Sequence, residues 1–407
     1  MRETSSTGPV SGRQPSEPRR LPGVLRYARF DRNEIAGSLG DLGTFLPLAV
    51  GMSAQNGLDF GAALFFAGLF NVVTGLTFSI PMAVQPMKAI AAVALTEHLS
   101  LPEILAAGAA VSAFVLLLGL TGLIDWVNRV VPRSVVRGVQ LALGLSLLMK
   151  GLQMVAGTGA PLGADSYATG AVAAIAVVAL FSSRRVPSAL VLFVAGVAVA
   201  VWKTPEIAQS LHLGVSLPRW SPPNWPAFVS AFPKAVLPQI PLTTLNSVVA
   251  VCALSIDLFP DRAASPRRVA VSVGMMNLVA AWFGGMPMCH GAGGLAGQYR
   301  FGARTNGSIL FLGAVKMALG VLFGASLMSL CRAFPASILG VMLGFSGIEL
   351  ALVTRDQSDR ASASTMLLTA GACLALNNVG LGFVIGLSFA LLLRLPPFRV
   401  EDSQNRA

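Results

Sequence analysis

The sequence predicts an all-α membrane protein of fourteen segments, arranged as two inverted repeats of seven. First, hydrophobic residues make up 54% of 407 residues, charged residues only 12%, and the mean hydropathy is +0.70. A soluble domain of this length would carry about twice that charged fraction. Second, several windows of 18 or more residues are almost free of charge, which is typical of transmembrane helices. Third, one short signature occurs in both halves of the chain.

The apolar segments alternate with short hydrophilic breaks. The first set is expected at about 33–54, 59–80, 85–98, 103–127, 134–156, 167–182 and 187–203, and the second at about 233–258, 267–284, 289–299, 306–330, 335–353, 362–377 and 379–395. The segments near 85–98 and 289–299 are too short to cross ~30 Å of hydrocarbon as helices. Both are third in their set, which indicates a helix broken at the same place in each repeat.

The remaining residues form tails and a connector. Residues 1–32 are rich in Pro, Ser and Arg and have no apolar core, so they are not a signal peptide and predict a disordered cytoplasmic tail. Residues 33–203 form the first repeat, and 204–232 are expected to be an extracytoplasmic connector rich in Trp and Pro. Residues 233–395 form the second repeat, and 396–407 a cytoplasmic C-terminal tail.

The net charge of +11 is compatible with nucleic-acid or membrane binding, and its distribution favours the membrane. Most Lys and Arg lie in the breaks that are cytoplasmic if the N-terminus is cytoplasmic. The outer breaks then carry only Lys203, Arg219, Lys234 and Arg332, and three lysines remain within segments: Lys88, Lys150 and Lys316. These charges are therefore topology signals of an inner-membrane protein with both termini inside, and no nucleic-acid partner is expected.

The repeated signature runs from an Asn to a Pro-Met pair. GLFNVVTGLTFSIPM (68–82) and GMMNLVAAWFGGMPM (274–288) share Gly, Asn, Pro and Met at an offset of 206 residues. A second match follows in the same order, at Pro132 and Pro335. Seven segments separate the copies, and because seven is odd, the second copy is inverted in the membrane. Secondary transporters with inverted repeats bind substrate at the repeat interface near the midplane.

The residues after each Pro-Met predict an anion site. Pro81 and Pro86 favour an extended stretch before a short helix, with Gln85 at its cap and Lys88 in its first turn. The second break, Cys289-His290-Gly-Ala-Gly-Gly, offers backbone N–H groups to a ligand at close range. Two helix N-termini facing each other favour an anion, and Lys88, a charge in the middle of the membrane, is the leading functional candidate. Kinking for helix packing is the alternative reading of the Pro and Gly residues.

Other polar residues within segments have two readings each. Asp41, two turns after Glu34, carries a coupling proton or pairs with Lys88, whereas Glu34 is expected to be solvated or paired with Arg. Glu349 is a candidate proton carrier or gate, and His290 either donates to the anion or is simply hydrogen-bonded. Thr244 and its neighbours in the eighth segment line the site or bond between helices. Lys316 is expected to form a structural pair.

The four cysteines, Cys252, Cys289, Cys331 and Cys373, have no paired spacing, so they predict neither a disulfide framework nor a zinc site. Cys289 and His290 are adjacent and have no acid nearby, which argues against a catalytic triad. We therefore expect no enzyme, no metal and no cofactor. A channel remains an alternative to a transporter, because sequence does not reveal alternating access.

Three segments carry a family resemblance: PMAVQPMKAIAAVA (81–94), PLTTLNSVVAVC (241–252) and MPMCHGAGGLAGQYRFGAR (286–304). They resemble the signature segments of the molybdate transporter family of bacteria, algae and plants, which is related to the SulP sulfate permeases but lacks their C-terminal regulatory domain. The resemblance covers most of residues 30–395. Here too the chain ends soon after the fourteenth segment, so no regulatory domain is expected.

The resemblance implies a fold of seven plus seven helices in which a core domain slides against a gate domain. It also implies uptake of molybdate between the third and tenth segments. Carried onto this chain, the site residues would be Gln85, Pro86, Met87, Lys88, His290, Gly291, Ala292, Gly293 and Gly294, with Asp41 and Thr244 nearby. Sulfate transport is the nearest alternative, and a nucleobase–proton symporter is a further one. The expected partners are the oxyanion, the lipid bilayer and, as an open alternative, a second copy of the chain.

Overall fold

The computed structural model describes residues 27–124, 131–180, 187–206 and 213–395. The first repeat contains α1 (Arg32–Ser38), η2 (Leu39–Asp41), α2 (Leu42–Asn56), α3 (Phe60–Phe78), β1 (Val84–Pro86), α4 (Lys88–Thr96), α5 (Leu101–Thr121), α7 (Arg133–Ala156), α8 (Tyr167–Leu180) and α9 (Ser188–Lys203). The second contains α11 (Trp225–Ala231), η3 (Phe232–Val236), α12 (Leu237–Leu242), η4 (Thr243–Ala250), α13 (Val251–Leu258), η5 (Pro260–Arg262), α14 (Pro266–Ala280), β2 (Met288–His290), α15 (Ala292–Arg300), α16 (Gly307–Arg332), α17 (Ala336–Leu352), η6 (Val353–Asp356), α18 (Arg360–Ala375) and α19 (Val379–Leu392).

Each predicted segment corresponds to one of these elements or to a continuous series of them, so the predicted seven-plus-seven fold is confirmed. In the described part, seven helices are long and apolar enough to cross a membrane, and the two broken segments each consist of a short strand followed by a short helix. Residues 1–26 of the predicted N-terminal tail (1–32), the predicted C-terminal tail at 396–407, and Arg129, Arg184 and Arg185 lie outside the described residues. Arg32, the last residue assigned to the N-terminal tail, is the first residue of α1.

The eighth segment differs from its expected start. It begins at Trp225 instead of residue 233, capped by Asn224, whose side chain accepts a hydrogen bond from the Ala227 N–H. It then runs to Leu258 with π-helical turns at 232–236 and 243–250. Proline lacks the N–H that an α-helix needs, and π-turns occur where the regular hydrogen-bond ladder is disturbed. The end of the predicted connector is therefore helical.

The helices pair as an inverted repeat requires. The second segment packs on the eleventh (α3 on α16) and the ninth on the fourth (α14 on α5), which are equivalent pairs, and α7 packs on its own counterpart α17. The signature glycines explain the close approach: a Cβ at Gly68 would collide with Gly313 of α16, and one at Gly274 with Leu116 of α5. Small residues at such crossings let helix backbones pack tightly in a membrane.

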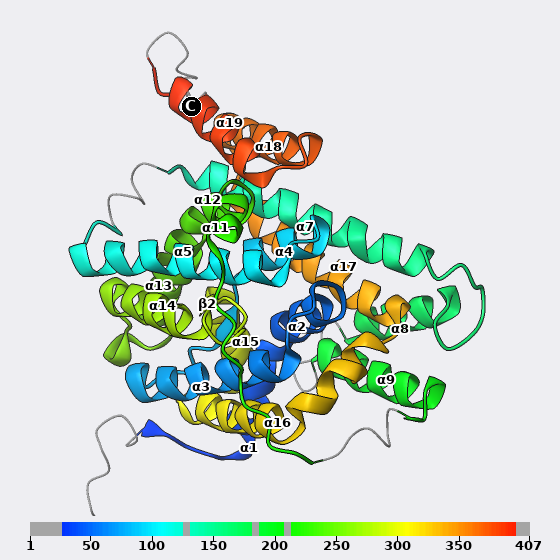
Figure 1. Ribbon diagram of the computed structural model, residues 1–407. Coiled ribbons are helices and arrows are strands. Elements are labelled where there is room, and N and C mark those ends of the chain that lie inside the picture. Colours follow the sequence, from blue (N-terminus) through cyan, green and yellow to red (C-terminus); the bar gives the residue numbers. More distant parts are fainter. Residues whose placement is uncertain (1–26, 125–130, 181–186, 207–212, 396–407) are drawn as a thin grey trace, which may run out of the picture.

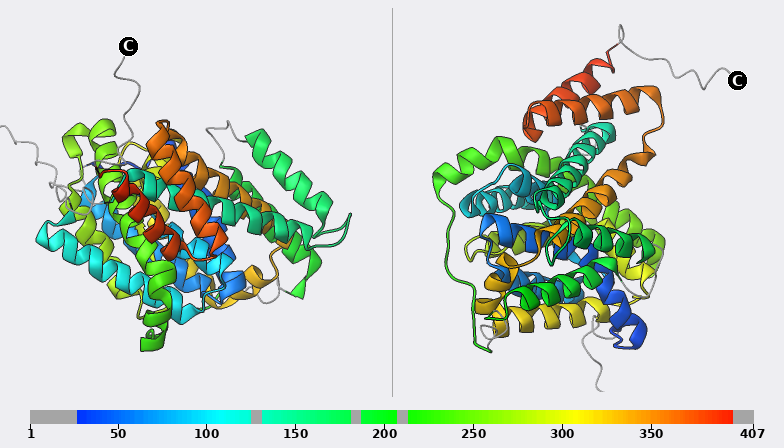
Figure 2. Two further views of the ribbon diagram at one scale, coloured as in Figure 1. Left: turned by 90° about the horizontal axis from the view of Figure 1, so that it is seen from above. Right: turned by 90° about the vertical axis from the view of Figure 1, so that its right-hand side faces the viewer.

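The broken segments lie in the interior of the molecule. Figure 1 shows β2 and α15 near the centre, with α2 and α4 close by, whereas α18 and α19 form a hairpin at the edge. That hairpin packs on α7. Figure 2 shows the stretch before α11 running along the outside of the molecule, where Gly214 and Ser216 donate backbone hydrogen bonds to Leu322 and Val321 of α16.

Candidate functional site

The two broken segments meet as a two-stranded antiparallel ladder. Val84 pairs with His290, Gln85 with Cys289 and Pro86 with Met288. Val84 and His290 are separated by the same 206 residues as the two signatures, so the pseudo-twofold axis that relates the repeats passes through this pair. The Met87 N–H extends the contact by donating to the Pro287 carbonyl at 2.9 Å. The extended pieces thus satisfy part of each other's backbone in the interior of the molecule.

The signature asparagines hold these extended pieces in place. The Asn71 Oδ1 accepts the Val84 N–H at 2.9 Å. The Asn277 Oδ1 accepts the Met288 N–H at 2.6 Å, and its Nδ2 donates to the carbonyls of Met288 and Val273. Non-helical backbone at membrane depth requires such partners, because no water is available there. The signature therefore marks the residues that allow the helices to break.

The N-terminus of α4 is less open than the sequence predicts. The Gln239 Oε1, from α12, accepts the N–H groups of Ala89 and Ile90 at 2.9 and 3.2 Å. The Gln239 Nε2 in turn donates to Thr243 Oγ1 at 2.7 Å. Two of the N–H groups at this helix start are therefore occupied by a side chain, so the N-terminus of α4 has fewer donors for an anion than its place in the predicted site suggests. What α4 still presents is the cation of Lys88 in its first turn.

The N-terminus of α15 consists of small residues packed against Gln85. A Cβ at Gly291 or Gly294 would collide with the Gln85 side chain, so these glycines make room for it. A Cβ at Gly293 would lie 3.8 Å from Lys88 Nζ, which places the ammonium next to the first turn of α15. The first N–H groups of a helix have no acceptor within the helix and favour an anion. Lys88 and this turn are thus brought together.

A cavity of about 440 Å³ opens at this place. Its polar lining residues are Thr44, Lys88, Ser188, Arg300, Ser346 and Glu349, and its glycines are Gly40, Gly43, Gly293 and Gly297. The lining residues come mainly from α2, α4, α7, α8, α9, α15 and α17, with Gly40 in η2. Of the predicted site residues, Lys88, Gly293 and Glu349 line this cavity. The carboxylate and the ammonium therefore share one space.

Asp41 has a different partner from the one considered for it. Its Oδ2 lies 3.0 Å from the Nζ of Lys316 on α16, and both side chains are buried. The same ammonium lies 3.9 Å from the centroid of the Phe45 ring. Of the two readings given for Asp41, pairing with Lys88 was wrong, because Asp41, in η2, pairs with Lys316 of α16 instead. The expected structural pair of Lys316 is confirmed.

Glu34 is also more enclosed than predicted. Its side chain is buried and accepts the backbone N–H groups of Arg304 and Thr305 at 2.8 and 2.9 Å. The expected partner was solvent or an Arg side chain, whereas Glu34 accepts a hydrogen bond from the backbone of Arg304. Glu34 therefore fixes the turn that follows α15.

The other predicted site residues lie around the cavity without lining it. The His290 ring is buried, with Nε2 3.0 Å from the Ser272 hydroxyl and its edge against Phe78. The Thr244 hydroxyl donates to the Pro241 carbonyl at 3.0 Å. The remaining members are Gln85 and Pro86 in β1, Met87 at the N-cap of α4, and Gly291, Ala292 and Gly294 at the start of α15. They form the backbone frame behind Lys88 and Gly293. The predicted helix cap at Gln85 was wrong, because the extended strand continues to Pro86 and α4 begins at Lys88.

Two features of the site were missed in the sequence. Gln239 had a signal, since a glutamine between two prolines in an apolar segment is a polar group that requires a partner. Gly40 packs against the Gly297 backbone, and Gly37 against Ala303, so the first segment lies directly on α15. Their spacing in IAGSLGDLG suggests a close helix contact, but the sequence does not name the partner.

Known proteins match this chain over more than half of its length. The family model described as "Molybdate transporter of MFS superfamily" matches residues 33–147 and 231–350. The chain is 40% identical to Molybdate transporter 2 of Arabidopsis thaliana, over 89% of this chain and 87% of that protein. It is 38% identical to Molybdate transporter 1 of Chlamydomonas reinhardtii, over 89% of this chain and 91% of that protein.

Solved structures share the fold at low sequence identity. The transmembrane domain of the cyanobacterial bicarbonate transporter BicA superposes with a TM-score of 0.61 at 17% identity, covering 89% of this chain and 99% of that one. The murine anion transporter Slc26a9, in an inward-facing state, gives a TM-score of 0.66 at 13% identity, covering 94% and 73%. The match to the family model and the identity to the Arabidopsis and Chlamydomonas transporters show that this multi-pass membrane protein belongs to the molybdate transporter family.

Proposed function

We propose that this protein imports molybdate across the cytoplasmic membrane as a secondary transporter. The observation that carries the proposal is Lys88, an ammonium at a broken helix that lines the interior cavity beside the first turn of α15. A charge at membrane depth is costly and marks an ion pathway by default. Two of the family's members are named molybdate transporters and match nearly the whole chain.

The proposed binding mode uses one full charge and one helix end. A tetrahedral dianion between Lys88 Nζ and the backbone N–H groups at Gly293 and Gly294 would receive charge-assisted hydrogen bonds from both sides. The other predicted site residues support this backbone frame without lining the cavity: Gln85, Pro86, Met87, His290, Gly291, Ala292 and Thr244. The cavity of about 440 Å³ leaves room for an anion that enters with water.

The proposed orientation places the mouth of the cavity in the cytoplasm. Arg300, Phe301, Leu180 and Val353 line it and stand at the ends of elements that lead into Arg-bearing breaks. Under the positive-inside rule these breaks are cytoplasmic. The conformation is then inward-facing, and α8, α9 and α17 belong to the part that moves against the part holding the anion.

We assign the proton-coupling or gating role first to Glu349, then to Asp41 and His290. Glu349 faces the same cavity as Lys88, so an ionised carboxylate there opposes a dianion and a protonated one does not. Asp41 is held by Lys316, and His290 by Ser272, at a greater remove from the cavity. Proton coupling through Glu349 predicts that molybdate uptake is driven by an inward proton gradient and that Glu349→Gln removes this dependence.

The function is tested by molybdate accumulation in proteoliposomes, measured by plasma mass spectrometry. Uptake above the equilibrium level, with sulfate at equal concentration competing weakly, supports a molybdate transporter. If added sulfate inhibits molybdate uptake more strongly than the same concentration of a second molybdenum isotope added as molybdate, sulfate is the substrate instead. Flux that never exceeds equilibrium under any ion gradient would indicate a channel.

The site is tested with Lys88→Gln, which removes the charge and keeps a polar side chain. We expect initial uptake to fall at least tenfold, because a lost charge-assisted contact in a buried site is worth more than 1.4 kcal/mol. Lys150→Gln is the matched control, since Lys150 contacts His98 outside the cavity. Wild-type uptake by Lys88→Gln would overturn the site while leaving the transport activity standing.

A further inference from the structure

A second hollow lies on the outside of the molecule, between α3 and α14. It is a groove of about 630 Å³ whose apolar wall includes Leu69, Val73, Met275 and Val279. Val73, Met275 and Val279 are each about half exposed. It shares no lining residue with the cavity at Lys88. In a membrane-spanning protein such a surface faces lipid.

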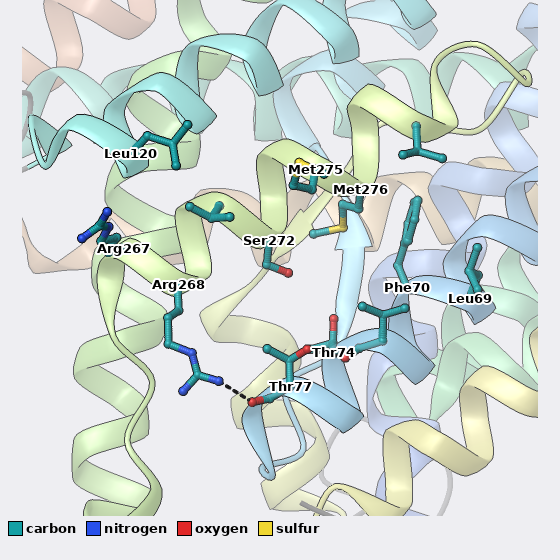
Figure 3. A pocket seen from close by; sticks show the side chains of 13 residues that line it. Leu69, Phe70, Thr74, Thr77, Leu120, Arg267, Arg268, Ser272, Met275 and Met276 are labelled. Carbon is teal, nitrogen blue, oxygen red and sulfur yellow. Dashed lines mark hydrogen bonds between the residues drawn. The ribbon is translucent and has the colours of Figure 1, made fainter.

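One end of the groove is strongly basic. Arg267 and Arg268, both exposed, stand there in the first turn of α14, and Figure 3 shows them at the side opposite Phe70 and Leu69. Arg268 donates to the Thr77 carbonyl at 2.8 Å, which turns its guanidinium toward α3, as the dashed line in Figure 3 indicates. No acidic residue is among those lining the groove. The basic end therefore has charge to offer a ligand.

The position of these arginines on α14 is unfavourable without an anion. The positive end of the helix dipole lies at the N-terminus and disfavours cations there. The first turn of α14 contains no acidic residue. Arg267 has no hydrogen-bond or ion-pair partner among the residues that the structure describes. An anionic group next to both side chains and the helix start would balance this charge.

The length of the groove fits one leaflet. From Arg268 to Val279, α14 rises by roughly 16 Å at ~1.5 Å per residue. Half of a ~30 Å hydrocarbon core is about 15 Å. A phosphate at the arginines and an acyl chain along Val73 and Met275 would therefore span from the interface to the midplane. Basic pockets between transmembrane helices are typical sites for anionic lipid headgroups.

We propose that the groove between α3 and α14 binds an anionic glycerophospholipid. Its phosphate lies against Arg267 and Arg268, and one acyl chain packs along α3 and α14. The bound lipid lies next to a residue that contacts His290, because Ser272 lines the groove and its hydroxyl lies 3.0 Å from the Nε2 of that histidine. The site is independent of the proposed substrate, so it stands whichever oxyanion the chain carries.

The test is native mass spectrometry of the purified full chain titrated with phosphatidylglycerol or phosphatidylethanolamine. We expect the wild type to retain phosphatidylglycerol preferentially, and Arg267→Gln/Arg268→Gln to lose that preference by tenfold or more, since each basic residue contributes about a factor of five near an anionic lipid. Arg360→Gln/Arg394→Gln, with the same charge change on exposed residues away from the groove, should retain it.

A second variant fills the groove and keeps the charge. Val73→Trp should reduce phosphatidylglycerol retention severalfold, whereas Val172→Trp, on the exposed face of α8, should not. Equal retention of the two lipids by the wild type would overturn the proposal, as would equal losses in the groove and control variants. Displacement of the lipid by millimolar inorganic phosphate would show that the arginines bind a free anion, which also contradicts it.

Discussion

The two helix starts at the centre of the molecule are related by the repeat, but they offer different chemistry. At α4, Gln239 occupies two backbone donors, and the first turn contributes the charge of Lys88. At α15, the equivalent position of Lys88 is Gly294, and the first turn contributes backbone and space. The inverted repeat thus supplies a symmetric scaffold, and the side chains make it asymmetric. One anion can then be held by one cation and one helix end.

The difference between the two helix starts matters only if Lys88 is available to bind a ligand. This requires that the other buried lysine, Lys316, is neutralised by Asp41. Asp41→Asn should destabilise the protein by about 3–5 kcal/mol, because it leaves the Lys316 ammonium buried without a counter-charge. Thermal unfolding in detergent measures this change. The double variant Asp41→Asn/Lys316→Met should recover part of the loss.

The matched control for that pair is Asp356→Asn. Asp356 pairs with Arg137 at 2.6 Å, but its side chain is 42% exposed. Solvent-exposed ion pairs contribute roughly 0–1 kcal/mol, so this variant should change stability little. If Asp41→Asn lowers the stability no more than Asp356→Asn does, Asp41 does not neutralise Lys316. Lys316 would then be a second candidate, beside Lys88, for binding the anion.

The two signature asparagines are expected to stabilise their halves of the molecule to different extents. Asn277→Ala should cost about 2–3 kcal/mol, since it strips both backbone groups of Met288, whereas Asn71→Ala should cost about 1–2 kcal/mol, since it strips the Val84 N–H. Unfolding midpoints of the two variants, measured side by side, check the order. Equal losses would mean that the repeats hold their strands equally well.

An effect similar in size to that of Asn71→Ala concerns the capped start of α4. Gln239→Met keeps the side-chain volume but removes the acceptor from the Ala89 and Ile90 N–H groups, and should cost about 1–2 kcal/mol. Gln55→Met is the control, because Gln55 contacts only the Met154 sulfur among its described hydrogen-bond partners. A Gln239→Met protein as stable as this control would show that the two N–H groups find other acceptors.

Much of the fold could be predicted from the sequence because membranes impose simple rules. The length of apolar runs, the placement of Arg and the odd spacing of the signatures were enough for fourteen segments and an inversion. The start at Trp225 was missed, because residues 204–232 are rich in Trp and Pro and were assigned to the connector, whereas the helix begins at Trp225 and continues past Pro233 through a π-turn. Hydropathy does not record such local compensation.

The site was less predictable, because its partners are far apart in sequence. Lys88 and Gly293 could be found from the charge and the broken helices. The pairing of Asp41 with Lys316, 275 residues away, and the capping of α4 by Gln239, 150 residues away, depend on how helices pack. Nothing within the local motifs distinguishes a free helix N-terminus from one that another segment has capped.

The central claim is that an oxyanion lies between Lys88 and the start of α15. A cryo-electron microscopy structure of the full chain with molybdate tests it most directly, since molybdenum scatters far more strongly than protein atoms. The account predicts density within hydrogen-bond reach of Lys88 Nζ and the backbone of Gly293 and Gly294. Density at Arg300 alone, or at Arg267 and Arg268, with none beside Lys88, would contradict it.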